Sequence, residues 1–226
     1  MKLIKQLKLL ASLLLLFFSF SSLAKAENRY FYQLGYGYVE GNTHGKFKQN
    51  SPEPPFAGII QGYRADFGLG LSSEINKIKV DYILSYSPDA FNNQVDTKNS
   101  CGAGTLECRI NIKDSIDLGV KIYLPVNYNN ISPAIYLGLS NADIQLKTLN
   151  RASSPFPMMS HQRNWGAAAG ASLNYPLKEY NVDISLDYSW TKYETNVEKV
   201  TQPNANEFAF SRPEVHSTSL KVKKYF

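Results

Sequence analysis

The sequence predicts an all-β fold, an eight-stranded antiparallel up-and-down transmembrane β-barrel with four long extracellular loops and three short periplasmic turns. Three observations predict it. The chain opens with a segment typical of exported proteins, eight later segments alternate apolar and polar residues, and the connections between these segments alternate in length. Alternation with a period of two is typical of strands, because successive side chains point to opposite faces of a sheet.

The first 26 residues have the pattern of a secretory signal peptide. Three lysines precede the apolar run Leu9–Phe20, and the segment ends in Ala24-Lys25-Ala26, a small-residue cleavage pattern. The run is shorter than the ~20 residues of a transmembrane anchor. We therefore expect residues 1–26 to be removed and the barrel to occupy residues 27–226.

Removal of this segment changes the charge balance. The whole chain has 24 basic and 19 acidic residues, and residues 1–26 hold four lysines and no acid. The remaining 20 basic and 19 acidic residues give a net charge of +1 and are interspersed. The net charge of +5 for the whole chain therefore does not indicate a nucleic-acid partner. No phosphate-loop or metal motif is recognised, and we expect no cofactor.

The first three predicted strands carry an apolar stripe opposite glycine and polar residues. In Arg29–Gly41, every second residue from Tyr30 to Tyr38 is tyrosine or leucine. In 59–71 the odd positions are mostly apolar, whereas the even positions hold glycines and two charges. In 78–86 the even positions are apolar or tyrosine, and the odd positions include two charges and a serine.

The fourth predicted strand, 109–124, has the clearest alternation. Its even positions are isoleucine, leucine or valine apart from Asp114, and its odd positions carry most of the charge. A helix would spread these lysines and isoleucines around its circumference. The remaining strands are predicted at 131–139, 165–175, 182–190 and 217–226, of which the alanine-rich 165–175 has the weakest pattern.

The connections supply an independent signal. Long ones are predicted at about 39–58, 87–108, 141–163 and 192–214, and short ones at about 72–76, 125–130 and 176–181. Antiparallel neighbours place all long connections at one end of the barrel and all short ones at the other. Outer-membrane barrels have this asymmetry, with short periplasmic turns and longer extracellular loops.

The apolar face has two possible surroundings. In a membrane barrel it faces lipid, with tyrosines near the interfaces. In a soluble barrel of lipocalin type it points inward. Alternation alone does not separate the two, whereas loop asymmetry and the aromatic C-terminus favour the membrane.

In the membrane orientation, we expect the interior to be filled by mutually paired charges. An ion-conducting lumen is the alternative. The predicted inner charges are Arg64, Lys79, Arg109, Lys113, Lys121, Lys221 and Lys223, with Asp66, Asp81, Asp117, Asp183 and Asp187.

Two cysteines, Cys101 and Cys108, lie in the second long connection. In an oxidising compartment we expect a disulfide that closes a small loop and stabilises the chain by about 2.5 kcal/mol. Two free thiols are the alternative. A metal site would need further ligands, and no other histidine or cysteine is nearby.

Two long connections contain apolar residues that we expect to bind a partner protein. Exposed apolar clusters mark partner sites, and the prolines beside the first cluster stiffen the backbone that presents it. Alternatively, these residues fold back over the barrel mouth. The candidates are Phe156, Met158 and Met159 in the third connection and Phe208 and Phe210 in the fourth.

The histidines offer little support for catalysis, and we expect no enzyme. His44 and His161 fall in long connections, and His216 lies near the top of the last strand. A lipid-modifying site built from His216 and Ser217 or Ser219 would need the histidine within hydrogen-bond reach of the serine. A solvated histidine at the barrel rim is the alternative.

The C-terminus resembles the assembly signal of Gram-negative outer-membrane proteins. Phe226 is the terminal aromatic, and Leu220 and Val222 alternate before it. Lys224 departs from the usual apolar or aromatic residue at the third position from the end, but a lysine there can extend to the membrane interface.

The chain as a whole resembles small OmpA-like and opacity-type barrels, and in overall character it is most similar to the rickettsial adhesins. The resemblance implies residence in the outer-membrane bilayer, insertion by the outer-membrane assembly machinery, and virulence-related binding of host-surface or serum proteins. The alternatives are a structural barrel for envelope integrity, a lipid-modifying enzyme, and a narrow channel.

Overall fold

The computed structural model describes residues 28–47, 56–88, 99–100, 106–150, 158–194 and 208–226. Side chains are described over 28–41, 62–88, 112–144, 163–194 and 213–226. The elements are β1 (Arg29–Phe47), β2 (Phe56–Ile75), β3 (Ile78–Ser87), β4 (Asn99–Ser100), β5 (Leu106–Tyr123), β6 (Ser132–Asn150), β7 (Met158–Leu177), the short 3-10 helix η2 (Lys178–Tyr180), β8 (Val182–Tyr193) and β9 (Phe208–Tyr225). Within these ranges, no helix is long and apolar enough to cross a bilayer.

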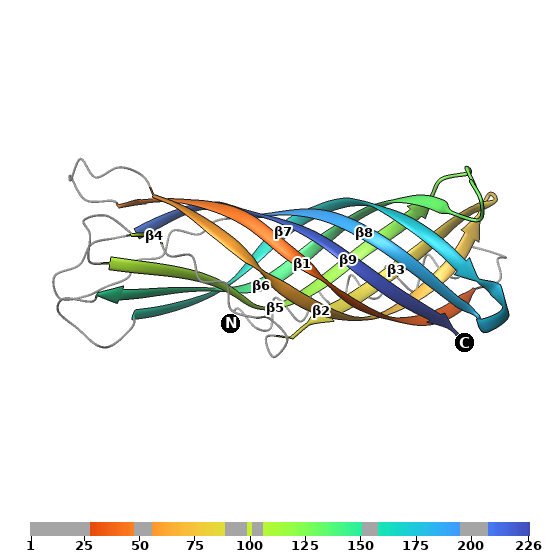
Figure 1. Ribbon diagram of the computed structural model, residues 1–226, viewed down its shortest axis with the longest axis horizontal. Helices are drawn as coiled ribbons and strands as arrows, with labels where there is room; N and C mark the ends of the chain where they lie inside the picture. The colour runs from red at the N-terminus through yellow and green to blue at the C-terminus, as the bar shows by residue number, and fades with distance from the viewer. Residues whose placement is uncertain (1–27, 48–55, 89–98, 101–105, 151–157, 195–207) are drawn as a thin grey trace, which may run out of the picture.

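Eight strands close into a barrel (Figure 1). Each pairs in antiparallel fashion with its neighbours along the chain, β3 pairs with β5, and β1 pairs with β9 to close the wall. The two-residue strand β4 pairs only with β5 and lies outside the closed ring. The predicted eight-stranded antiparallel up-and-down barrel is confirmed.

The three short turns lie at one end of the barrel, near the C-terminus (Figure 1). Asn76 and Lys77 join β2 to β3 with φ values of 52° and 67°. Asn129 and Asn130, also at positive φ, close the β5–β6 turn, and Asn181 at φ 52° ends η2 before β8. Asparagine tolerates this left-handed backbone better than most residues, which explains why the chain reverses there.

The predicted long connections began too early in the sequence. β1 and β2 remain paired as far as Gly45 and Phe56, and β6 and β7 as far as Thr148 and Met158. The apolar alternation fades where a strand leaves the hydrocarbon, but the backbone pairing continues. The chain between these extended strands, at 48–55, 89–98, 101–105, 151–157 and 195–207, lies outside the described residues.

The strands differ greatly in length. β3 and β8 have 10 and 12 residues, close to the 9–11 that a tilted strand needs to cross a bilayer. The other six wall strands have 18–20 residues. Beyond the ends of β3 and β8, the wall continues as two three-stranded ribbons, β2–β1–β9 and β5–β6–β7 (Figure 1). We refer to them as the outer ribbons.

The apolar face of the wall points outward. Leu34 is 50% exposed and Leu69 is 62% exposed, whereas the inward Asp81 is 0% exposed. This is the reverse of a soluble barrel, so the lipocalin-type alternative is wrong. Aromatic residues lie on the outer face towards both ends of the membrane-crossing part, as predicted for membrane interfaces. They are Tyr30, Tyr128, Tyr175, Tyr180 and Phe226 near the turns, and Tyr38, Tyr63, Tyr86, Trp165 and Trp190 towards the outer ribbons.

Of the predicted inner charges, the side chain of Arg109 lies outside the described part, and the prediction for Lys113 is wrong because β5 contains a β-bulge. Ile112 pairs with Ile144 and Ser115 pairs with Ala142, so two residues of β5 lie opposite Asp143 alone. A bulge of this kind shifts the alternation by one residue. Ile112 therefore lies on the inner face, and Lys113 leaves it.

Candidate functional site

The barrel interior holds a dense set of charged side chains. Among the described residues, five inward cations face five inward carboxylates, and they form two clusters connected by Lys121. The cations are Arg64, Lys79, Lys121, Lys221 and Lys223, and the carboxylates are Asp66, Asp81, Asp117, Asp183 and Asp187.

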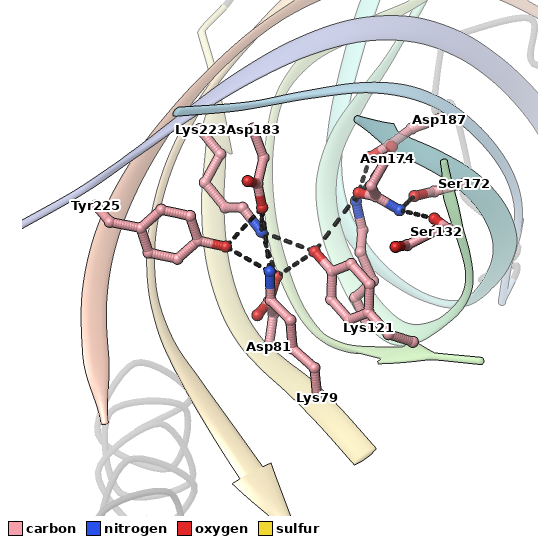
Figure 2. Close-up of polar contacts among 11 residues, drawn as sticks. Lys79, Asp81, Lys121, Ser132, Ser172, Asn174, Asp183, Asp187, Lys223 and Tyr225 are labelled. Carbon is pink, nitrogen blue, oxygen red and sulfur yellow. Dashed lines mark hydrogen bonds and ion pairs between the residues drawn. The ribbon is translucent and has the colours of Figure 1, made fainter. Parts of the chain in front are cut away.

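The cluster nearer the turns is centred on the ammonium of Lys223 (Figure 2). Its Nζ lies 2.7 Å from Asp81 Oδ2 and 3.1 Å from Asp183 Oδ2, and it donates to the Tyr123 hydroxyl at 2.7 Å. Tyr123 in turn donates to Asp81 Oδ2 at 2.7 Å. One cation from β9 is thus shared by carboxylates from β3 and β8, which connects both sides of the barrel.

A second lysine completes this cluster at the periplasmic mouth. Lys79 Nζ donates to Asp183 Oδ2 at 3.1 Å and to the Tyr225 hydroxyl at 2.8 Å, and Tyr225 donates to Asp183 Oδ2 at 2.7 Å. The ammonium also lies 4.4 Å from the ring centroid of Tyr123, a cation–π distance. The phenols therefore bridge lysine and aspartate and fill the space between them.

The other cluster lies farther towards the outer ribbons. Arg64 Nε is 3.0 Å from Asp66 Oδ1, and the Arg64 guanidinium also pairs with Asp117. Lys221 Nζ lies 3.3 Å from Asp66 Oδ2 and 3.5 Å from Asp187 Oδ2. Each carboxylate is opposed by a cation, as charges held inside a narrow barrel require.

Lys121 connects the two clusters. Its Nζ lies 3.1 Å from both oxygens of Asp187 and 3.5 Å from Asn174 Oδ1. The Asn174 amide donates to the Ser132 carbonyl oxygen at 3.0 Å and to Ser172 Oγ at 2.6 Å, as Figure 2 shows. The hydrogen-bonded set thus extends along the barrel axis.

Little free space remains around these clusters. A cavity of about 50 Å³ lies beside Arg64 and Lys221, and a cavity of about 240 Å³ opens at the turn end beside Lys77 and Lys79. The inner cavity is small beside the side chains that line it. The predicted paired and filled interior is confirmed over the described residues.

Large apolar and aromatic residues enter the interior above the charges. Val39, Ala142, Tyr193 and Val215 are all at most 9% exposed at this level. The Tyr193 hydroxyl lies 3.0 Å from Ser140 Oγ. Buried polar residues share this level, since Ser115 and Asn164 lie directly opposite Ala142 in the neighbouring strands.

The histidine–serine pair, the alternative to a solvated rim histidine, does not form. His216 lies on the outer face of β9, where its Nδ1 is 2.7 Å from the Tyr188 hydroxyl. Ser217 and Ser219 belong to the opposite, inward face of the same strand, since neighbouring residues alternate. His44 and His161 lie in β1 and β7, not in connections, and their side chains are outside the described part.

Most predicted partner-binding residues lie at strand ends and not in loops. Met158 and Met159 begin β7, and Phe208 and Phe210 lie at the start of β9. Their side chains are outside the described part, as is the whole of Phe156.

The predictions for the cysteines and for the C-terminus both remain predictions. Cys101 and the side chain of Cys108 lie outside the described part, so the disulfide stays a prediction. At the C-terminus, the Phe226 N–H donates to the Tyr30 carbonyl oxygen at 3.1 Å. Lys224 donates to the Tyr180 carbonyl oxygen at the turn end, and its extension to the membrane interface stays a prediction, as does the assembly signal at Phe226.

Sequence reasoning missed the inward tyrosines and Asn174 as members of the charge clusters. The sequence could have placed these tyrosines inside the barrel. Tyr123 and Tyr225 each follow a lysine of the charged face by two residues, so they belong to the same face. A phenol on that face can donate to a carboxylate and accept from a lysine.

Comparisons of the sequence with protein-family models and with characterised proteins find no match. Several solved structures are similar to this chain at low sequence identity. Neisserial surface protein A (NspA) is 12% identical over 87% of this chain and 97% of its own, with a TM-score of 0.47. Ail of Yersinia pestis, in complex with the heparin analogue sucrose octasulfate, is 14% identical over 87% of this chain and 99% of its own, with a TM-score of 0.43. A major outer membrane protein from Thermus thermophilus is 12% identical over 88% of this chain and 100% of its own, with a TM-score of 0.48. Likenesses at this level do not bear on function.

The geometry of this chain itself defines its class. An apolar outward face, aromatic residues towards both ends and a paired, charged interior are the properties of a barrel whose solvent is lipid. The protein is an integral outer-membrane β-barrel that crosses the bilayer with eight strands.

Proposed function

We propose that this outer-membrane β-barrel is an adhesin that binds host-cell or host serum proteins through its outer ribbons and the segments that connect them. The observation that carries the proposal is strand length. Six strands of 18–20 residues are nearly twice as long as the bilayer requires, so they extend well beyond it. The overall resemblance to rickettsial adhesins agrees with this proposal.

A rigid wall suits such a role. The ion clusters tie β2, β3, β5, β8 and β9 together inside the membrane. Strands held in this way reach the cell surface already ordered, which lowers the entropy lost when a partner binds.

The residues proposed to contact the partner lie at the far ends of both ribbons. Met158 begins β7 of one ribbon and Phe208 begins β9 of the other. Phe156, Met159 and Phe210 are close to them in sequence. Large apolar residues at such positions supply much of the affinity in protein–protein interfaces.

Paired substitutions test these contacts. Met158→Ser with Met159→Ser, and separately Phe208→Ser with Phe210→Ser, are expected to weaken binding to host cells at least about tenfold. Val126→Ser with Tyr128→Ser is the matched control, because these apolar residues are 60% and 74% exposed at the opposite end of the barrel. Binding would be measured by flow cytometry with cells that display equal amounts of folded barrel. Unchanged binding by both test variants would contradict the assignment.

A structural barrel without a ligand is the second candidate. The balanced interior charges favour it, because a closed wall strengthens the envelope without transport. A strain that lacks the protein would then leak periplasmic enzymes but attach normally to host cells. Normal leakage and lost attachment would favour the adhesin.

The proposal also includes processing on export. Residues 1–26 would be removed, the assembly machinery would recognise Phe226, and Cys101 would form a disulfide with Cys108. N-terminal sequencing of protein from outer membranes is expected to start at Glu27. The mass of the processed protein is expected to increase by two hydrogens on reduction, and an unchanged mass would exclude the disulfide.

A further inference from the structure

A polar cluster interrupts the apolar outer face of the wall on β5, β6 and β7. The Arg163 Nη2 donates to both carboxylate oxygens of Asp114, at 2.7 and 2.8 Å. Its Nη1 donates to Asn141 Oδ1 at 3.2 Å. None of these side chains belongs to the interior clusters.

Local strand structure brings these residues together. The β5 bulge places Asp114 opposite Asp143, and Asp143 pairs with Arg163 across β6 and β7. Asn141 lies directly opposite Trp165, so these two side chains share the outer face at neighbouring positions.

The cluster lies at the outer boundary of the bilayer. Asn141 is the tenth residue of β6 from Ser132 at the turn end, and a strand crosses the hydrocarbon in about 9–11 residues. Leu137 and Leu139, which precede it on the same face, are 53% and 43% exposed to the lipid. The cluster therefore faces the headgroups of the outer leaflet.

One donor of the cluster has no acceptor. Asn141 is only 9% exposed, and its Nδ2 finds no hydrogen-bond partner among the described residues. The amide cannot be reversed, because its oxygen accepts from Arg163. Buried donors are almost always satisfied, so an acceptor from outside the chain is expected there.

We propose that this cluster binds the saccharide headgroup of an outer-leaflet glycolipid. A sugar hydroxyl can accept from the Asn141 amide and donate to the Asp114 carboxylate at the same time. The indole of Trp165 offers a flat surface for the apolar face of a sugar ring. Leu137 and Leu139 lie where the acyl chains of the same molecule would run.

The charge of the cluster favours hydroxyls over a bare phosphate. The Arg163 charge is already opposed by Asp114. The cation of Lys113 at the same bulge is matched in number by the carboxylate of Asp143 across the strand pair. A phosphate would meet no uncompensated cation from this set. Burial at the lipid boundary favours a membrane glycolipid over a soluble glycan.

Tryptophan fluorescence provides the test. The chain has two tryptophans, so Trp190→Phe leaves Trp165 as the single reporter in the full-length protein purified in detergent. Titration with purified rough-type lipopolysaccharide is expected to change the Trp165 emission saturably. Phosphatidylglycerol and the water-soluble core oligosaccharide are expected to cause a change only at much higher concentrations.

Asn141→Asp is the decisive variant. It retains an acceptor for Arg163 and removes the unsatisfied donor, so the barrel is expected to fold while lipopolysaccharide binding weakens about tenfold. Glu40→Gln, which changes an exposed residue of β1 on the opposite part of the wall, is the control and should bind normally.

Four results would overturn the proposal. An unchanged Trp165 emission, or equal binding by Asn141→Asp, would mean that ordered water alone satisfies the amide. Equal affinity for the soluble oligosaccharide would exclude a membrane glycolipid as the source. Stronger binding of phosphatidylglycerol would show that phosphate, not sugar, is recognised.

Discussion

At the scale of single residues, Lys223 shows how the interior is held together. Its side chain is 7% exposed and lies between Asp81 and Asp183, which are 1% and 9% exposed. A buried ion pair is costly to form, but removal of one partner leaves a charge without compensation. The residue thus stabilises the barrel mainly by preventing that penalty.

We expect Lys223→Met to lower the free energy of unfolding by about 3–5 kcal/mol, because Asp81 loses its ammonium partner. Lys192→Met is the matched control, since the side chains of Lys192 and its partner Glu214 are each 38% exposed and such surface pairs contribute little to stability. Urea titration in detergent micelles, followed by the mobility of unheated protein in gels, measures both. An equal decrease in the free energy of unfolding for Lys223→Met and Lys192→Met would refute a special role for Lys223.

Small residues make room for the inward Tyr136. A Cβ added at Gly119 would overlap the Tyr136 ring. Gly119→Ala is therefore expected to cost about 1–3 kcal/mol by overpacking. Gly119→Ala combined with Tyr136→Leu should cost clearly less than the sum of the two single changes. Strict additivity in the urea titration would show that the ring moves aside at no cost.

At the scale of elements, the tight β2–β3 turn imposes positive φ on Lys77. A non-glycine residue is strained in that conformation, and two-residue hairpin turns prefer glycine at this position. We expect Lys77→Gly to raise the free energy of unfolding by up to about 1 kcal/mol and Lys77→Val to lower it. Urea midpoints that shift in the same direction for both variants would contradict this explanation.

The strand ends show why element boundaries were harder to predict than the elements themselves. Sequence alternation located the membrane-crossing part of every wall strand, for example 78–86 within β3. It ended β6 at Leu139, although the strand continues to Asn150. Outside the bilayer the outer face is no longer required to be apolar, so the sequence pattern disappears while the hydrogen-bonded ladder persists.

At the scale of the whole molecule, the orientation of the wall determines topology. The turns at 76–77, 124–131 and 178–181 lie at the end that holds the C-terminus, and the outer ribbons lie at the other end (Figure 1). We expect protease added to intact cells to cut only beyond the ribbons and never at 124–131. Mapping of the fragments by mass spectrometry measures this, and a cut at 124–131 would invert the topology.

The filled interior predicts a closed barrel. Five carboxylates oppose five cations among the described inward residues, and the cavity between them is about 50 Å³. In planar bilayers we expect no steady ionic current from the purified protein. A reproducible open state would restore the narrow-channel alternative.

The sequence by itself determined the barrel, the number of wall strands and the placement of Asp81, Lys121 and Lys223 on one shared face of the wall. Period-two alternation suffices for this, because the even-numbered and odd-numbered residues of a regular strand point to opposite faces, whichever strands lie beside it. The lipid-facing orientation was only favoured, since an inverted soluble barrel has the same alternation.

Only the tertiary structure decided which charges meet and where the alternation of inward and outward residues shifts. Lys223 meets Asp81 and Asp183 because the register of β3, β8 and β9 brings distant segments to one level of the barrel. The β5 bulge turned Ile112 inward and placed Asp114 beside Arg163 on the outer face. The sequence showed only that Asp114 interrupts the apolar positions of this strand, not that a bulge lies there. Register and bulges arise from pairing across the whole wall, so they cannot be derived from one strand alone.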